Sequence, residues 1–422
     1  MLRGLYFRPL FYVIAASRAL FRGSAPIFTL KPCKRELFMK MNKRVLSMLM
    51  TTTMLATVTA CGSDTNADVA GTTETTVAAE ETTTASTDDA TVAETTEEVA
   101  ESYEIPEGMY LSELTGEPIS EEIQDQRPIA VMVDNESLAL PHYGIAEADV
   151  VYEMMNSTKN DRITRLMCII KDWGNIEQMG SIRSTRPTNI LLMSEWNAVL
   201  CHDGGPYYND QYFVRDWADH FSGTFSRVSN GKSREYTEYI LSGDLEANFE
   251  DSGYSVNYNE YANEDTSHFT FTDYGTTVDL SDNGYQYCAD ATFIDIKPFS
   301  HNGSQLVYNE ETQTYDYYEY GEIHEDAEDG EVLTFDNVIL QKCSFAQLDE
   351  NGYLIYNCID TNQPGLYATK GKITDIVWTK TTETEITRYY DENGNELTMN
   401  TGKTYIALIP DDTWDQLAIY GN

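Results

Sequence analysis

The stretch "RPIAVMVDN" (residues 127–135) holds an unbroken apolar run between a proline and two polar residues. A short run of this kind, rich in Ile, Val and Met, is typical of a strand that is buried on both faces. We therefore predict a core strand here, with Asp134 and Asn135 at its polar end.

Segments on the C-terminal side alternate between strand-like and helix-like patterns, which predicts a mixed α/β or α+β domain over residues 106–284. The expected elements are a helical turn and strand at 144–156, a strand at 162–173, a helix with Pro187 in its first turn followed by a strand ending at His202 at 186–205, and one or two helices at 233–254.

The pattern changes near residue 285 to short runs of alternating aromatic and β-branched residues. Turn signals separate these runs at "NEET" (309–312), "DENG" (349–352) and "DENGN" (391–395). We predict a β-rich second domain of antiparallel hairpins over 285–422. The last of these turns could also hold Ca²⁺ weakly, but no twelve-residue loop with a terminal Glu follows it.

The N-terminal part carries an export signal. From Met39 the text "MKMNKRVLSMLMTTTMLATVTACGSD" has a basic start, a short apolar core and small residues before a cysteine. Val58–Cys61 resembles a bacterial lipobox, so we predict a signal peptide at 39–60 and lipidation of Cys61, which places the protein on the outer face of the cell membrane.

Two further segments flank this signal. Residues 1–38 have no role in it, and we predict that they are a spurious extension, with the true start at Met39 or Met41. Residues 61–105 contain twelve acidic and no basic residues, which predicts a disordered, Thr-rich stalk.

Charge excludes some partners. Residues 106–422 contain 18 basic and 56 acidic residues, a net charge near −38, which argues against nucleic acid and against electrostatic adhesion to anionic lipid. Five cysteines remain in this part, an odd number without CxxC spacing. We expect small buried hydrophobic side chains, with room for one disulfide.

Several motifs resemble a known family. The run "RPIAVMVDN…ALPHYGIAEADVVYEMMN…ITRLMCII…GSIRSTRP…AVLCHDGG" is similar to the N-terminal domain of the YerB-like bacterial lipoproteins, a family of unknown function. The tail "YDYYEYGEIHED…LTFDNVIL…GKITDIVWTK…TRYYDENGNELTMNTGKTYIALIP" is similar to the family's C-terminal domain.

The resemblance implies an exported, lipid-anchored protein of mostly Gram-positive bacteria, with a mixed α/β first domain and a β-rich second one. It implies no activity. The sequence departs from the family pattern in having "LPHYG" (140–144) where "RPQSG" is usual, and "CHDGGP" (201–206) where "HAGGS" is common. Leu140 and His142 would change the chemistry of the first of these loops.

The best functional lead is a group of basic residues between 127 and 186. It holds seven of the 18 basic residues of the folded part: Arg127, Lys159, Arg162, Arg165, Lys171, Arg183 and Arg186. Two interpretations stay open: internal pairing with nearby carboxylates, or a site for an anionic ligand. Arg183 and Arg186 flank a helix start, which favours an anion.

The motif "CHDGGP" ends a predicted strand, a usual place for working residues. Cys201 and His202 invite a nucleophile interpretation, but neighbours along a strand point to opposite faces. We predict instead that His202, Gly204 and Gly205 shape a ligand pocket, or that His202 is structural. The six histidines are scattered without HxH or HExxH spacing, so we predict no metal and no cofactor.

We predict from the sequence that the protein acts by binding. The predicted partner is an anionic envelope component, such as peptidoglycan or teichoic acid, or an envelope protein, and the candidate ligand residues are Asn135, Glu153, Arg165, Arg183, Arg186, His202, Gly204 and Gly205. One alternative is a cell-wall enzyme that uses His202, Asp203 and Glu153 with an arginine-lined substrate site. Another is a purely structural interaction protein.

Overall fold

The computed structural model describes residues 103–281, 285 and 288–421. The predicted extension 1–38, signal peptide 39–60 and lipidation site Cys61 lie outside the described residues, as does nearly all of the predicted stalk. All described residues belong to one compact unit.

The predicted core strand is β3 (Ile129–Asp134), which is buried along its whole length. It lies inside an eleven-stranded mixed sheet, and β23 joins this sheet at β22. The other strands, in sheet order, are β12 (Cys288–Asp290), β22 (Lys372–Thr379) with β23 (Arg388–Tyr390), β21 (Gln363–Thr369), β18 (Asn337–Cys343), β25 (Thr404–Pro410), β4 (Val150–Met155), β5 (Thr164–Ile170), then β3, β7 (Val199–His202) and β8 (His220–Ser222).

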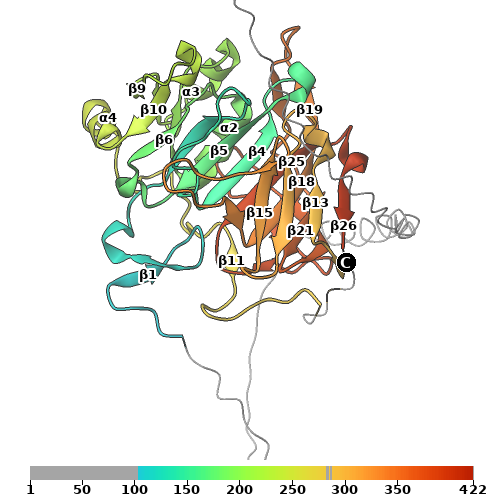
Figure 1. Ribbon diagram of the computed structural model, residues 1–422. Helices are drawn as coiled ribbons and strands as arrows, with labels where there is room; N and C mark the ends of the chain where they lie inside the picture. Colours follow the sequence, from blue (N-terminus) through green and yellow to red (C-terminus); the bar gives the residue numbers. More distant parts are fainter. Residues whose placement is uncertain (1–102, 282–284, 286–287, 422) are drawn as a thin grey trace, which may run out of the picture. The chain divides into compact units, whose positions relative to one another are not determined.

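The pairing of β25 with β4 joins the two halves of the chain. β25 lies between β18 and β4 and runs parallel to both, with Thr404 opposite Asn337 on one side and Val150 on the other. Figure 1 shows the three strands side by side at the centre of the molecule. One hydrogen-bonded sheet therefore crosses the boundary expected at residue 285.

The remaining strands of the described residues form a second sheet, whose Leu306, Tyr315 and Tyr317 pack into the same core as the large sheet, and four small sheets. The second sheet contains β16 (Glu322–Ile323), β15 (Thr314–Glu319), β14 (Gln305–Asn309), β13 (Phe293–Asp295), β26 (Ala418–Tyr420) and β17 (Thr334–Phe335). The small sheets are β6 (Gln178–Gly180), β10 (Glu238–Leu241) and β9 (Ser226–Arg227); β1 (Met109–Leu111) and β2 (Pro118–Ser120); β11 (Thr270–Phe271) and β24 (Thr398–Met399); and the hairpin β19 (Phe345–Gln347) and β20 (Leu354–Tyr356).

Helices are few. The α-helices of the described residues are α2 (Pro187–Met193), α3 (Asp210–Phe213) and α4 (Asp244–Ser252). The 3-10 helices are η1 (Glu121–Ile123), η2 (Asn160–Arg162), η3 (Trp173–Asn175), η4 (Ser194–Trp196), η5 (Tyr207–Asn209), η6 (Arg234–Tyr236), η7 (Lys297–Phe299) and η8 (Trp414–Gln416). None of these helices is long and apolar enough to cross a membrane.

The first half is consequently richer in sheet than the predicted α/β domain. The helical prediction for 233–254 is right for α4 but wrong for Glu238–Leu241, which forms the central strand of a three-stranded sheet. Its first three side chains are buried, and this packing outweighs the helical pattern of the flanking acidic segments. Pro187 does begin α2, and the strand β7 does end at His202.

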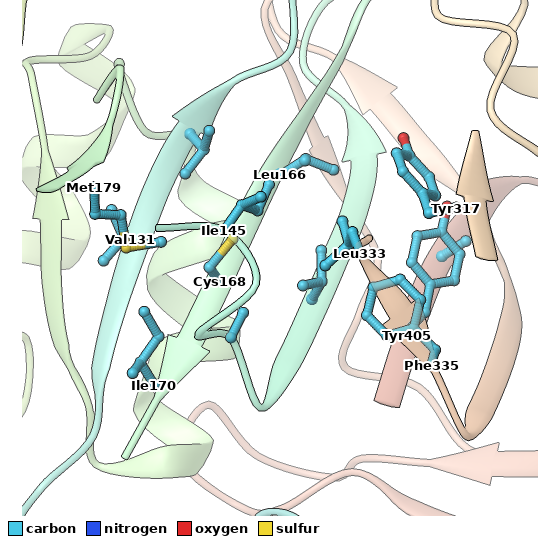
Figure 2. Packing of buried hydrophobic residues seen from close by; sticks show 14 of the residues in the cluster. Val131, Ile145, Leu166, Cys168, Ile170, Met179, Tyr317, Leu333, Phe335 and Tyr405 are labelled. Carbon is cyan, nitrogen blue, oxygen red and sulfur yellow. The ribbon is translucent and has the colours of Figure 1, made fainter. Parts of the chain in front are cut away.

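Both halves also share their apolar core. One cluster of buried side chains includes Leu166 and Cys168 of the first half together with Leu333, Phe335 and Tyr405 of the second. Figure 2 shows these side chains gathered across strands of both halves. Four of the five cysteines in the described residues are buried, Cys288 is exposed, and all five are free thiols.

Candidate functional site

The three candidate arginines meet where β3 and β5 pair. The antiparallel register places Asp134 at the end of β3 opposite Arg165 at the start of β5. Residues 181–183 then lie alongside the end of β3, where Val133 and Ile182 form an antiparallel bridge: Asp134 N donates to Ser181 O, and Arg183 N donates to Met132 O. We call Arg165, Arg183 and Arg186 the arginine cluster.

Two members of the cluster share one buried carboxylate. Arg183 Nε lies 2.8 Å from Asp134 Oδ2, and Arg165 Nη2 lies 3.4 Å from Asp134 Oδ1. Asp134 is completely buried. Arg183 also pairs with the half-exposed Glu235 at 2.5 Å. These contacts agree with the internal-pairing interpretation for Arg165 and Arg183.

Arg186 differs from both. Its side chain is buried, yet no carboxylate of the described residues lies within salt-bridge distance of it. Its Nε donates to Asn156 O at 3.1 Å, its Nη1 donates to Thr185 O at 2.9 Å, and the guanidinium lies 4.8 Å from the ring centre of Tyr353. Burial first, and then Arg165 and Arg183, lower the pKa of Arg186 to about 9.

A glycine loop lies directly against the cluster. Thr185 N donates to Gly204 O at 3.1 Å, and Asp203 N donates to Arg183 O at 3.0 Å. Gly205 has a φ of +158°, and a Cβ there would lie 2.9 Å from Thr185 O. Only glycine allows this approach, so the motifs "GSIRSTRP" and "CHDGGP" come together in the fold.

The second half of the chain also contacts the arginine cluster. The hairpin β19–β20 supplies Tyr353, and Tyr208 of the first half donates its hydroxyl to Leu348 O in the same hairpin at 3.3 Å. Tyr207 lies against Tyr208, with the ring centres 4.1 Å apart, and is 71% exposed. Tyr353 therefore lies over Arg186, and Tyr208 contacts the hairpin that carries Tyr353.

His202 lies beside the glycine loop, and both of its ring nitrogens contact other protein groups. It is buried, its Nδ1 contacts Gly204 O at 2.8 Å, and its Nε2 contacts His220 Nδ1 at 3.0 Å. Its ring stacks on Phe213. Burial and His220 lower its pKa to about 4. These contacts are those of a structural histidine.

Asn135 and Glu153 belong to a different, fully buried network. Glu153 accepts hydrogen bonds from Thr164 Oγ1 at 2.6 Å, Ser304 Oγ at 2.7 Å and Tyr405 OH at 2.6 Å. Asn135 Nδ2 donates to Thr164 Oγ1 at 3.0 Å. Burial raises the pKa of Glu153, although these hydroxyl groups oppose the rise.

The enzymatic alternative requires His202, Asp203 and Glu153 around one substrate. Glu153 is closed off from solvent in its own network, and Asp203 pairs with Arg227 at 2.9 Å. The two nitrogens of His202 are both engaged. This geometry does not bring these three residues together around one substrate.

Sequence reasoning did not select three residues that contact the arginine cluster, namely Asp134, Asn156 and Tyr353. Asp134 could have been found, because it ends an apolar strand next to a named candidate. Tyr353 could not, because nothing local to "NGYLIY" (351–356) indicates that it packs on an arginine 167 positions away.

Two regions of the chain match family models. Residues 114–255 match "Protein of unknown function (DUF3048) N-terminal domain", and residues 294–406 match the corresponding C-terminal domain. Together they cover more than half of the chain, in the family's order. The chain therefore belongs to the DUF3048 family, as its motifs predicted.

One relative and one solved structure show the same likeness. YerB of Bacillus subtilis (strain 168), provisionally named a lipoprotein, is 24% identical over 309 residues, which is 71% of this chain and 86% of YerB. The crystal structure of Bacillus subtilis YerB matches with a TM-score of 0.61 at 20% identity, over 74% of this chain and 99% of that one. This chain and YerB of Bacillus subtilis therefore share a fold.

Proposed function

We propose that the protein is held on the outer face of the cell membrane by a lipid on Cys61 and binds an anionic envelope component through the arginine cluster. The ligand group is an oxyanion, either a carboxylate of peptidoglycan peptides or a phosphate of teichoic acid. The provisional naming of YerB as a lipoprotein supports the anchor.

The observation that carries the binding proposal is the buried, carboxylate-free guanidinium of Arg186. Two backbone carbonyls only partly replace the hydration that a buried guanidinium loses. A carboxylate or phosphate would supply the missing charge and could accept two parallel N–H bonds from the planar fork.

The neighbours of Arg186 strengthen this argument. Arg165 and Arg183 have one fully buried counter-ion between them, Asp134, and the second partner of Arg183, Glu235, is 47% exposed. The three guanidinium groups thus lie together in a protein whose folded part carries a net charge near −38, and Asp134 and Glu235 are the carboxylates of the described residues within salt-bridge distance of them. Glu136 also acts on Arg165, from farther away. A local concentration of arginines favours an anionic ligand over a neutral one.

Sedimentation with purified sacculi tests the proposal. The full chain in detergent is mixed with sacculi that retain teichoic acid and with sacculi from which it has been removed. We expect Arg186→Gln to lose binding, and Arg388→Gln to keep it, because Arg388 makes an ordinary partly exposed pair with Glu396 at 3.3 Å.

Added salt should weaken binding by the wild type, since the attraction is electrostatic. Loss of binding on removal of teichoic acid would assign the ligand as phosphate, and retained binding would assign it as peptide carboxylate. Equal sedimentation of the wild type and Arg186→Gln, or sedimentation of neither, would contradict the proposal.

A further inference from the structure

A second cluster of chemistry-bearing side chains lies outside the arginine cluster, between the two halves of the chain. His142 comes from the loop that follows β3, Glu319 ends β15, and His324 follows β16. All three are buried, and one possible ligand atom of each lies within 4.8 Å of the others.

The hydrogen-bond partners of the two imidazoles determine where their lone pairs point. His142 Nε2 lies 2.7 Å from the backbone oxygen of Asp134, which can only accept, so this nitrogen carries the proton. Burial favours the neutral ring, and the Nδ1 of His142 is then a bare lone pair. It faces His324 Nε2 at 3.2 Å.

His324 lies between His142 and Glu319. Its Nε2 lies 3.2 Å from His142 Nδ1, and its Nδ1 lies 2.9 Å from Glu319 Oε1 in a contact that is not aligned as a hydrogen bond. When the neutral ring of His324 carries its proton on Nδ1, its Nε2 offers a lone pair to the same point as His142 Nδ1, and a cation there would be bound by both nitrogens.

The carboxylate oxygens of Glu319 are also available to bind a cation. Asn135 and Asn302 lie close enough to oppose the rise of its pKa, but neither oxygen of Glu319 has a hydrogen bond of normal geometry among the described residues. It is buried on a strand end that faces both histidines. A carboxylate in this state costs free energy unless a cation compensates it.

We propose that His142 Nδ1, His324 Nε2 and the carboxylate of Glu319 bind a divalent transition-metal ion, zinc in the first instance. Two imidazoles on a tetrahedral zinc, with bonds of about 2.0–2.1 Å, are separated by roughly 3.3 Å, close to the 3.2 Å found here. The backbone oxygen on His142 Nε2 is the outer partner that metal-bound histidines usually have.

The other close imidazole pair of the described residues provides a contrast. His202 Nε2 lies 3.0 Å from His220 Nδ1, but the remaining nitrogen of His220 makes no hydrogen bond within the described residues, so nothing there fixes which ring nitrogen carries the proton. His220 Nδ1 can therefore donate to His202 Nε2 in an ordinary hydrogen bond, and within the described residues this pair does not form a group of three close metal-ligand atoms with a carboxylate. This pair needs no metal and serves as a matched control.

The ion would connect the loop after β3 with the end of β15. The same Asp134 whose backbone oxygen holds His142 also holds Arg165 and Arg183 through its carboxylate. The metal is thus a structural element that fixes the first half against the second, next to the arginine cluster.

Metal titration of the full chain in detergent tests this proposal. Protein freed of metal by a chelator is titrated with Zn²⁺ and, in parallel, with Co²⁺, whose visible spectrum distinguishes tetrahedral from octahedral coordination. We expect a single equivalent to bind, a tetrahedral cobalt spectrum, and a higher thermal midpoint after addition of zinc.

Variants assign the ligands. His324→Gln should lose zinc binding, Glu319→Gln should weaken it by at least tenfold, and His220→Gln should bind as the wild type does. The wild-type titration decides the matter even if His324→Gln does not fold. Wild-type protein that neither binds zinc nor changes its midpoint, or His324→Gln protein with unchanged binding, would overturn the proposal.

Discussion

Two buried ionisable residues, Glu195 and Arg186, differ in the partners that balance their charge. Glu195 is buried but receives Lys380 Nζ at 3.0 Å, His268 Nε2 at 3.1 Å and the backbone and hydroxyl of Thr387. Arg186 has two carbonyls and an aromatic face. The charge of Glu195 is therefore balanced within the protein, whereas the charge of Arg186 would be balanced by the proposed ligand.

The fully paired Glu195 predicts a specific loss of stability in acid. Burial alone would raise its pKa, but Lys380, His268 and Thr387 hold it at about 2, below the ordinary 4.5. The stability it contributes is therefore present above about pH 4.5 and is lost as the pH falls toward 2. Urea unfolding of the wild type and Glu195→Gln across this range should show a shallower pH dependence in the variant.

The same variant should lose about 3–5 kcal/mol at neutral pH, because it leaves Lys380 buried without a counter-charge. Glu396→Gln removes an exposed partner of Arg388 and should change stability by less than about 1 kcal/mol. Equal acid sensitivity of Glu195→Gln and the wild type would show that this residue is not the acid-labile group.

At the scale of elements, the hairpin β19–β20 is the part of the second half that supports the arginine cluster. Thr158 Oγ1 donates to Gln347 Oε1 at 2.7 Å, and Thr158 N donates to Gly352 O at 3.0 Å. The hairpin turn therefore lies on the loop that follows β4, and it places Tyr353 over Arg186.

Gly352 makes this packing testable. It has a φ of +86°, and a Cβ there would lie 2.6–2.8 Å from side chains of residues 157–159. Gly330 has nearly the same φ, +84°, with open space around it. Both alanine variants should lose about 1 kcal/mol from backbone strain, and Gly352→Ala should lose more in chemical denaturation.

Gly352→Ala should also weaken binding to sacculi, since it displaces the loop that holds Asn156 and the turn that holds Tyr353. Gly330→Ala should leave this binding unchanged. Equal effects of the two variants on stability and binding would show that the hairpin does not position the cluster.

At the scale of the whole molecule, the eleven-stranded sheet makes the two halves mutually dependent. β25 supplies the parallel neighbour of β4, and the apolar core contains side chains from both halves. Removing either half would expose an unpaired strand edge and a large apolar surface.

We therefore expect one cooperative unfolding transition for residues of both halves. In differential scanning calorimetry of the full chain, the calorimetric and van't Hoff enthalpies should agree for this transition. Two separate transitions, each assigned to one half by its own tryptophan or proteolysis signal, would contradict the mutual dependence.

Much of this architecture was predictable from local sequence, and the rest was not for a physical reason. The strand 129–134, the helix that starts at Pro187 and the hairpin around "DENG" follow from apolar periodicity and turn residues. The pairing of β25 with β4 joins residues about 250 positions apart and leaves no local signal. β10 was missed because four residues in acidic text carry too little pattern.

The site shows the same division. Arg183, Arg186, Gly204 and Gly205 were identified because unusual residues stand in conspicuous motifs, and the structure brings these motifs together. The separation of Asn135 and Glu153 from them depends on which way each strand residue faces. The meeting of His142 with His324, 182 residues apart, appears only in the folded chain.

The central claim is that Arg186 takes its counter-charge from a ligand, and a thermal-shift measurement tests it most directly. The unfolding midpoint of the full chain is measured in phosphate, in acetate and in chloride at matched ionic strength, for the wild type, Arg186→Gln and Arg388→Gln. We predict that phosphate, or acetate if the ligand is a carboxylate, raises the midpoint of the wild type and of Arg388→Gln by more than that of Arg186→Gln, which should show only the general effect of the salt. An equal effect of both anions on all three proteins would contradict the claim.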